Sequence, residues 1–251
     1  MKKQIHTSPV TEAFLSGDEC PFCYLQRDTE RRTIRYFAGA GASYMEPEVR
    51  GVTNRLGFCS HHTKTLYDYG NSLGSALMLQ THMEDVLLML RQLQSQPEKA
   101  QKAGIFRKKT EESQPRWQAI QERADSCAIC QRMEETRQRH FRVFFDLLKE
   151  AEFRQYVEQS KGFCLHHFAQ LLEASEAHLP ASQQAWFYET MYQVMTANLE
   201  RVKEDLDLLI SKYDYRNADL PWGNARDALQ RAMQKMGSVH PADPPYRKDD
   251  R

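Results

Sequence analysis

The sequence predicts a mainly α-helical protein in which one helical unit occurs twice in tandem. Apolar residues recur every three or four positions over two long stretches, near 72–94 and 181–213, and this is the period of an amphipathic helix. No clear run of alternating apolar residues indicates a sheet. In addition, the string GFCxHH occurs twice, and each copy follows a CxxC pair.

The spacing of matching strings indicates the duplication. The CxxC pairs lie 107 residues apart, the GFC strings lie 105 apart, and the strings Glu48-Val49-Arg50 and Glu152-Phe153-Arg154 lie 104 apart. Offsets this similar indicate the same order of elements in both halves, with small insertions or deletions in loops. We place one repeat at 10–94 and the other at 117–213, joined by a linker at 95–116 that is rich in Lys, Gln, Glu and Pro.

Each half is expected to contain, in order, CxxC, a long helix, a short helix, GFCxxH leading into a helix, and a final long helix. The long helix after CxxC is predicted over 24–37, with its counterpart over 133–148. Pro180 and Ser182 signal the start of the last helix of the second half.

A C-terminal extension at 214–251 is predicted to be partly disordered. Its segment 224–236 predicts a peripheral helix, whereas 237–251 contains three prolines and many charged residues and predicts disorder. One face of this helix carries Ala225, Leu229, Ala232 and Met236.

The overall composition excludes several classes of protein. The chain has 251 residues, of which 41% are hydrophobic and 27% charged, as is ordinary for a globular protein. Lys+Arg and Asp+Glu both number 34, and this balance argues against nucleic acid as the main partner. No apolar run approaches the ~20 residues of a membrane span, and residues 1–6 lack the apolar region of a signal peptide. We therefore expect a cytoplasmic protein, in which CxxC indicates a metal or redox site before a disulfide.

All six cysteines belong to the repeated pattern. Zinc takes four nitrogen or sulfur ligands in a tetrahedron, often from two short-spaced pairs. CxxC supplies one pair and C-x2-H the other, so each repeat offers three thiolates and one imidazole. The candidate ligands are Cys20, Cys23, Cys59 and His62 in the first repeat, and Cys127, Cys130, Cys164 and His167 in the second.

Pairing of the half-sites within each repeat is the simpler expectation, because each unit then closes on itself. Pairing across the repeats is the alternative. The predicted fold is thus a tandem duplication of a helical unit, each organised around a CxxC/CxxH metal site.

The neighbouring histidines leave a second alternative open. His61 and His166 each stand beside the favoured histidine. Each either replaces it as ligand or donates a hydrogen bond near the metal.

The first CxxC pair is expected at the start of a helix. Pro21 suits the first position of this helix, which places Cys20 at the cap and Cys23 in the first turn. Ser126 or Asp125 is the expected cap in the second copy. A helix N-terminus favours the thiolate form of a nearby cysteine.

Zinc, two ions per chain, is the favoured cofactor, with an iron–sulfur cluster as the alternative, although the spacings match no ferredoxin run. A thioredoxin-like role needs a βαβ context that the pattern lacks. The sequence contains no GxSxG, HExxH or paired carboxylate motif, so no catalytic residue is assigned. We expect a metal-stabilised binding or adaptor protein with a protein partner; a redox protein or enzyme that uses the cysteine clusters is the alternative.

These strings resemble those of a functionally uncharacterised prokaryotic family, a domain of unknown function with CPxC near the N-terminus and a downstream GFCxxH, often repeated. The resemblance covers roughly residues 15 to 210. It implies His62 and His167 as the ligands, and it carries no activity. The second CxxC departs from the pattern because Ala128 stands where proline is expected.

Overall fold

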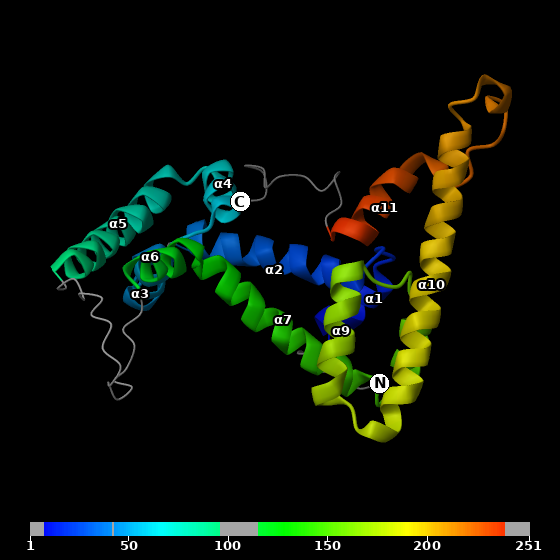
Figure 1. Cartoon of the computed structure of the whole chain (residues 1–251), viewed down its shortest axis with the longest axis horizontal. Helices are drawn as coiled ribbons and strands as arrows, with labels where there is room; N and C mark the ends of the chain where they lie inside the picture. The colour runs from blue at the N-terminus through cyan, green and yellow to red at the C-terminus, as the bar shows by residue number, and fades with distance from the viewer. Residues whose placement is uncertain (1–7, 42, 96–114, 239–251) are drawn as a thin grey trace, which may run out of the picture. The chain divides into compact units, whose positions relative to one another are not determined.

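A computed structural model describes residues 8–41, 43–95 and 115–238, and every regular element within these ranges is a helix (Figure 1). The predicted mainly α class is confirmed. Most of the predicted linker, and the C-terminal end from 239 onward, lie outside the described residues. No helix in the described ranges is both long and apolar enough to cross a membrane.

The first half of the chain contains five α-helices and a 3-10 turn in the described residues, and the second half and the extension contain the rest. In order these are α1 (Ser8–Leu15), α2 (Pro21–Ala38), η1 (Ser43–Met45), α3 (Pro47–Leu56), α4 (Ser60–Tyr69) and α5 (Ser72–Ser95), then α6 (Arg116–Asp125), α7 (Ala128–Leu147), α8 (Ala151–Glu158), α9 (Leu165–His178), α10 (Ala181–Ser211), η2 (Tyr215–Asn217), η3 (Ala225–Asp227) and α11 (Ala228–Gly237).

The predicted order of helices is observed in both halves. α2 and α7 are the long helices after CxxC, α3 and α8 are the short ones, α4 and α9 follow GFC, and α5 and α10 are the final long helices. Two short helices, α1 and α6, precede the CxxC pairs and were not predicted. The shared order agrees with a duplication, which itself stays a prediction.

Two compact units divide the described residues. Unit 1 comprises 8–29 and 134–238, and unit 2 comprises 30–133 apart from its undescribed positions. α2 and α7 each contribute residues to both units. Each unit therefore combines segments from both predicted repeats.

Phenylalanine dominates the core of unit 1. Phe14 lies 5.1 Å from Phe153 between ring centroids and is stacked on Phe144 at 5.8 Å. Phe22 and Phe163, which stand beside ligand cysteines, belong to the same core. Unit 2 has a smaller core that includes Ile34, Phe37, Leu66, Met78 and Ile129. Each cysteine pair thus adjoins a packed core.

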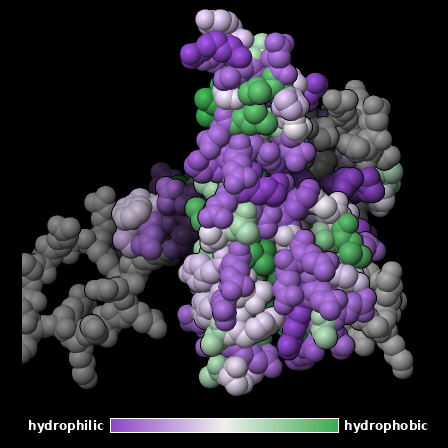
Figure 2. Space-filling model, turned by 90° about the vertical axis from the view of Figure 1, so that its right-hand side faces the viewer, coloured by the Kyte–Doolittle hydropathy of each residue, from purple (hydrophilic) through white to green (hydrophobic). Residues whose placement is uncertain are grey.

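Helix α10 belongs to unit 1 and buries Phe187, Met191 and Val202 along one face. Its outer surface is mostly hydrophilic, with small hydrophobic groups (Figure 2). The predicted apolar stripe of this helix is therefore a core-facing stripe.

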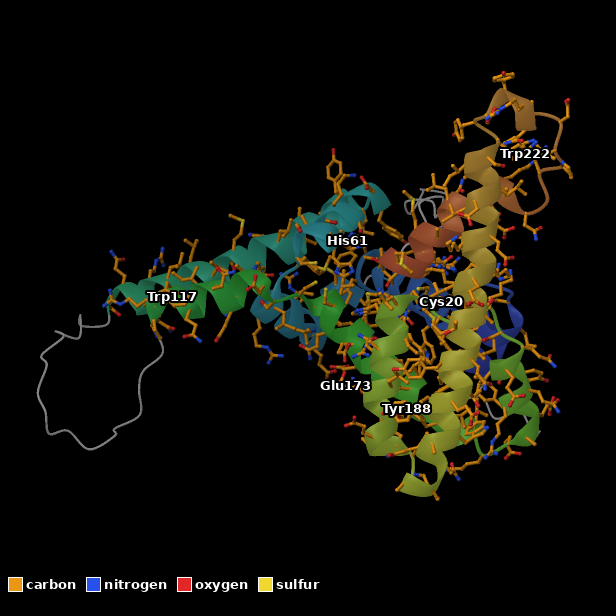
Figure 3. The ribbon with its side chains drawn as sticks, turned by 45° about the vertical axis from the view of Figure 1, so that its right-hand side comes forward. Cys20, His61, Trp117, Glu173, Tyr188 and Trp222 are labelled. Carbon is orange, nitrogen blue, oxygen red and sulfur yellow. The ribbon has the colours of Figure 1, made fainter. Side chains whose placement is uncertain are left out.

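Helix α5 differs from α10, because only Gly74 and Met78 are buried along its 24 residues. Most of its predicted stripe is exposed, including Leu73, Met83, Leu87 and Leu90. α6, which carries Trp117, runs beside α5 (Figure 3).

The helix predicted over 224–236 is observed as η3 and α11, and its predicted apolar face is buried only in part, at Ala225. Leu229 and Met236 are exposed, whereas Arg231, Gln234 and Lys235 are buried. The reason is that these polar side chains make hydrogen bonds and ion pairs with other residues of unit 1. Burial of such groups is stable only when they are paired.

Candidate metal centres

Each of the four cysteine-containing strings starts a helix. Cys20, Cys59, Cys127 and Cys164 immediately precede the first residues of α2, α4, α7 and α9. The next candidate ligand follows three residues later, within the first turn. In three of the four strings the backbone N–H of that residue donates to the preceding cysteine sulfur, at 3.3–3.4 Å. Both ligand atoms of a string consequently lie at the positive end of a helix, where thiolates are stabilised.

The predicted role of Pro21 as the first residue of α2 is confirmed, with Cys20 before it. The expected capping of the second copy by Ser126 or Asp125 is wrong. Cys127 occupies that position, and the Ser126 hydroxyl donates instead to the carbonyl oxygens of Leu56, at 2.7 Å, and Arg123.

The glycine of each GFC string turns the chain toward its cysteine. Gly57 has φ 59° and ψ −149°, and Gly162 has φ 77°, conformations that residues with a Cβ rarely adopt. The intervening Phe163 is fully buried in the core of unit 1. Glycine therefore makes the turn, phenylalanine anchors it, and cysteine follows at the helix start.

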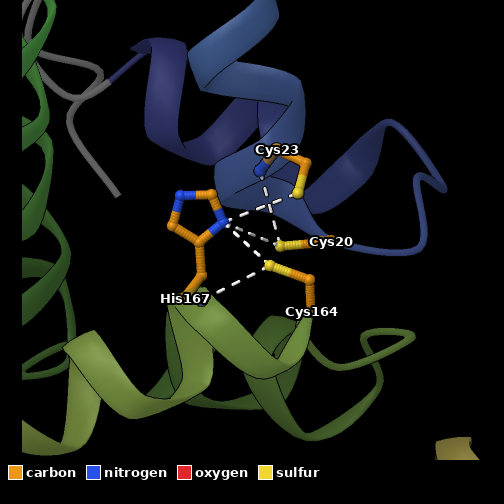
Figure 4. Close-up of side chains that lie close together, drawn as sticks. All are labelled: Cys20, Cys23, Cys164 and His167. Carbon is orange, nitrogen blue, oxygen red and sulfur yellow. Dashed lines mark hydrogen bonds between the residues drawn. The ribbon is translucent and has the colours of Figure 1, made fainter. Parts of the chain in front are cut away.

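The first cluster, site 1, lies in unit 1 and consists of Cys20, Cys23, Cys164 and His167 (Figure 4). The Nδ1 atom of His167 lies 3.5 Å from the sulfurs of both Cys20 and Cys23, and 3.1 Å from the sulfur of Cys164. All four side chains are buried.

The second cluster, site 2, lies in unit 2 and consists of Cys59, His62, Cys127 and Cys130. The Nδ1 atom of His62 lies 3.3 Å from each of the three sulfurs. The sulfurs of Cys59 and Cys130 are 3.8 Å apart, and Cys130 is exposed.

These distances fit a tetrahedral ion. Four ligands at about 2.3 Å for sulfur and about 2.0–2.1 Å for nitrogen give edges of about 3.8 Å between sulfurs and about 3.5 Å between nitrogen and sulfur. The measured edges are 3.8 Å and 3.1–3.5 Å. The arrangement is therefore suited to one metal ion in each site.

The thiols of each site influence one another's ionisation. In site 1, burial and the Cys164 sulfur raise the pKa of Cys20 to about 12, and contacts with both neighbouring sulfurs raise the pKa of Cys23 further. In site 2, burial opposes ionisation of Cys127, but hydrogen bonds from His62 and backbone N–H groups outweigh it and lower its pKa to about 6. Three thiolates within one site repel each other, and a divalent cation offsets that repulsion.

The expectation that half-sites pair within each repeat is wrong, because each site joins the CxxC of one repeat to the GFCxxH of the other. The cause is helix length. α2 has 18 residues and α7 has 20, so each carries the chain about 27–30 Å away from its own CxxC. The following GFC string is then in the other compact unit.

Site 1 has further contacts from α11, which sequence reasoning missed. The ammonium group of Lys235, 0% exposed, donates to the Glu19 carbonyl oxygen at 2.6 Å and to the Lys161 carbonyl oxygen. Just beyond α11, the Ser238 hydroxyl donates to the Cys164 sulfur at 3.2 Å. Lys235 thus bridges the two segments that lead into the ligand pairs.

Site 2 has an acidic neighbour that was also missed. Glu30 Oε1 lies 3.3 Å from Nε2 of His62 and 2.7 Å from Nε2 of His61. With Nδ1 turned to the sulfurs, His62 has its other ring nitrogen near a carboxylate, an arrangement that orients metal-bound histidines in proteins. The local sequence gives no signal for Glu30 or Lys235, because their roles depend on tertiary contacts.

The structure places the alternative histidines outside both four-residue clusters. His61 is exposed and contacts Glu30, with which it and His62 form a smaller group of possible metal ligands. His166 is also exposed, and its Nε2 lies 2.9 Å from the side-chain nitrogen of Gln170. The four-atom clusters therefore use His62 and His167.

The sequence matches a protein-family model over residues 1–243. The chain belongs to the family of unknown function DUF6062. No curated protein and no solved structure shows significant similarity to it. The likeness to an uncharacterised family is confirmed, and the function of this DUF6062 member has to be inferred from its own residues.

Proposed function

We propose that this DUF6062 protein is a cytoplasmic zinc protein, in which sites 1 and 2 each hold one structural zinc ion and the helices serve to bind another protein. The observation that carries the proposal is the geometry of the eight ligand atoms, whose edges match those of a tetrahedral zinc site. Thiolate-rich zinc sites are compatible with the reducing conditions of the cytoplasm.

A structural role is favoured over a catalytic one because each site has four protein ligands. A catalytic zinc keeps one position open for water or substrate. In both sites the fourth position is occupied by the histidine Nδ1 atom, at 3.1–3.5 Å from the sulfurs.

The same geometry favours zinc over the iron–sulfur alternative. The four ligand atoms of each site lie within 4.8 Å of one another, which leaves room among them for a single ion. An iron–sulfur cluster contains several irons and sulfides and separates its cysteine ligands more widely.

A binding role is supported by the exposed face of α5. α5 carries exposed apolar side chains, among them Met83, Leu87 and Leu90, and Leu90 lines a pocket of about 250 Å³ together with Ile120 of α6. The pocket is lined mainly by apolar residues, including Leu56, Phe58, Val86 and Leu90. Exposed apolar groups that gather on one helix are typical of surfaces that bind a partner.

Metal analysis with X-ray absorption tests the zinc sites. We expect two zinc ions per chain, each with three sulfur and one nitrogen neighbours, and no visible absorption. Cys59→Ser and Cys164→Ser should each lose one ion and retain the other, whereas the exposed control His61→Ala should retain both. Iron in a coloured protein, or full zinc content in both serine variants, would contradict the proposal.

The binding role has a separate test on α5. Met83→Glu with Leu87→Glu should leave zinc content and helix content unchanged, because both side chains are exposed. The double variant should lose a cross-linked partner that the wild-type chain retains in cell extracts. Equal cross-linking of variant and wild type would remove α5 from the proposed surface.

A further inference from the structure

Sites 1 and 2 contain the same ligand types but differ in their access to solvent. All four ligands of site 1 are buried. In site 2, Cys130 is exposed and Cys59 is half-buried, while His62 and Cys127 are buried. The two accessible sulfurs are also neighbours, 3.8 Å apart.

The difference arises from what covers the sulfurs. In site 1, the Ser238 hydroxyl donates to the Cys164 sulfur, and the Ser238 carbonyl oxygen lies 3.3 Å from the Cys23 sulfur. In site 2, the hydrogen bonds of the Cys59 and Cys130 sulfurs within the described residues stay inside the cluster. Among the described residues, no segment outside the cluster bonds to these two sulfurs, and Cys130 is exposed at the outer edge of site 2.

Access and thiolate character together decide which cysteines react with oxidants. Oxidation is favoured at accessible thiolates that stand next to a second cysteine able to form the disulfide. Cys130 meets the condition of access, and Cys59 supplies the second sulfur. A tetrahedral zinc ion would keep both as thiolates.

We propose that Cys130 and Cys59 are a modification site for hydroperoxides, at which oxidation forms a disulfide and releases zinc from site 2 while site 1 keeps its ion. This inference rests on the proposed function, because it takes both sites as zinc-bound.

The reaction balances with one hydroperoxide. The Cys130 thiolate attacks the terminal peroxide oxygen, the O–O bond breaks, and a sulfenic acid and an alkoxide or hydroxide result. The Cys59 thiolate then attacks the sulfenic sulfur, forms the S–S bond and expels hydroxide. Two thiolates lose two electrons, and the peroxide gains them. Cys127 and His62 alone would then remain to hold a zinc ion, too few ligands to retain it.

The product preserves the link between the two segments of site 2. Cys59 precedes α4 and Cys130 lies in the first turn of α7, and the backbone N–H of Ala128 donates to the Gly57 carbonyl oxygen at 3.0 Å. A disulfide between the cysteines joins the same two helix starts. A thiol reductant with zinc would therefore restore the original site.

The test uses the zinc-loaded full chain and hydrogen peroxide. Released zinc is followed with a colorimetric chelator, and the state of each cysteine is mapped by differential alkylation and mass spectrometry. We expect one zinc ion to be released in a fast phase, together with a Cys59–Cys130 disulfide. The cysteines of site 1 should remain reduced over the same period, and dithiothreitol with zinc should reverse the change.

Two variants of the same site provide a matched comparison. Cys130→His replaces the exposed sulfur by another zinc ligand and should slow peroxide-driven release by about 10-fold or more. Cys127→His replaces the buried sulfur and should retain the fast phase, because it keeps Cys59 and Cys130. If either variant fails to bind zinc, the alkylation map of the wild-type chain decides whether Cys59 and Cys130 are oxidised before the cysteines of site 1.

Simultaneous release of both ions, or earlier oxidation of Cys20, Cys23 or Cys164, would overturn the inference and leave the proposed function intact. A chain without zinc would instead contradict the proposed function. In that case the order of cysteine oxidation, measured in the same samples, still decides which sulfurs are the modification site.

Discussion

Replacing Lys235 by methionine removes the ammonium group that bridges the two ligand segments of site 1. The side chain is completely buried, and its Nζ contacts the Glu19 carbonyl oxygen at 2.6 Å, the Glu19 carboxylate at 3.3 Å and the Lys161 carbonyl oxygen. Methionine has a similar length but no hydrogen-bond donor. The Lys235→Met variant should therefore leave buried acceptors without their partner.

The expected loss of stability follows from these contacts. Removing one partner of a buried ion pair costs about 3–5 kcal/mol. Glu19 keeps a second cation, since Arg201 lies 2.6 Å from its carboxylate, and the variant also avoids the cost of burying an ammonium group. We therefore expect the unfolding free energy to fall by an amount at the lower end of this range, about 3 kcal/mol. This corresponds to a change of more than about 100-fold in the unfolding equilibrium constant.

Urea unfolding of the zinc-loaded chain, followed by circular dichroism, measures this change. A chelator added to the same variant should remove zinc from site 1 faster than from wild-type protein. Lys203→Met is the matched control, because Lys203 is 73% exposed and pairs with Asp207 on the surface. Its free energy of unfolding should not change measurably. A loss below about 1 kcal/mol for Lys235→Met would refute the bridging role.

The remaining predictions concern site 2 and metal binding in general. Glu30→Gln should weaken zinc binding at site 2 by about 10-fold or more, measured by competition with a chelator, because the carboxylate near His62 loses its charge. Gly57→Ala should lower the unfolding free energy of the chain by about 1–3 kcal/mol, because a Cβ at this position would lie 2.4 Å from the His82 ring. Gly51→Ala is the control. A Cβ at Gly51 has no atom within contact distance, so this variant should not lower the unfolding free energy. Acidification should release both ions, because protons compete with zinc for thiolate and imidazole; metal content after gel filtration at pH 7 and pH 4 measures this, and retention at pH 4 would contradict thiolate ligation.

Much of the fold was predictable because its signals are local. The apolar period of α10, and Pro180 before it, specify a helix whatever the rest of the chain does. α1 and α6 escaped prediction because they lie outside the repeated strings that marked the equally short α3 and α8. The buried polar residues of α11 were not predicted, because Lys235 and Arg231 find their partners only in the folded chain.

By itself, the sequence determined the helical class, the order of the helices and the eight Cys and His residues that come together. These depend on periodicity, helix starts and ligand spacing over a few residues. Only the tertiary structure decided that each site unites strings from different halves, because α2 and α7 carry the chain away from the CxxC pairs before the GFC strings are reached. It alone also showed that Ser238, just after α11, contacts the sulfurs of site 1 while Cys130 of site 2 stays exposed, since solvent access depends on how distant segments pack.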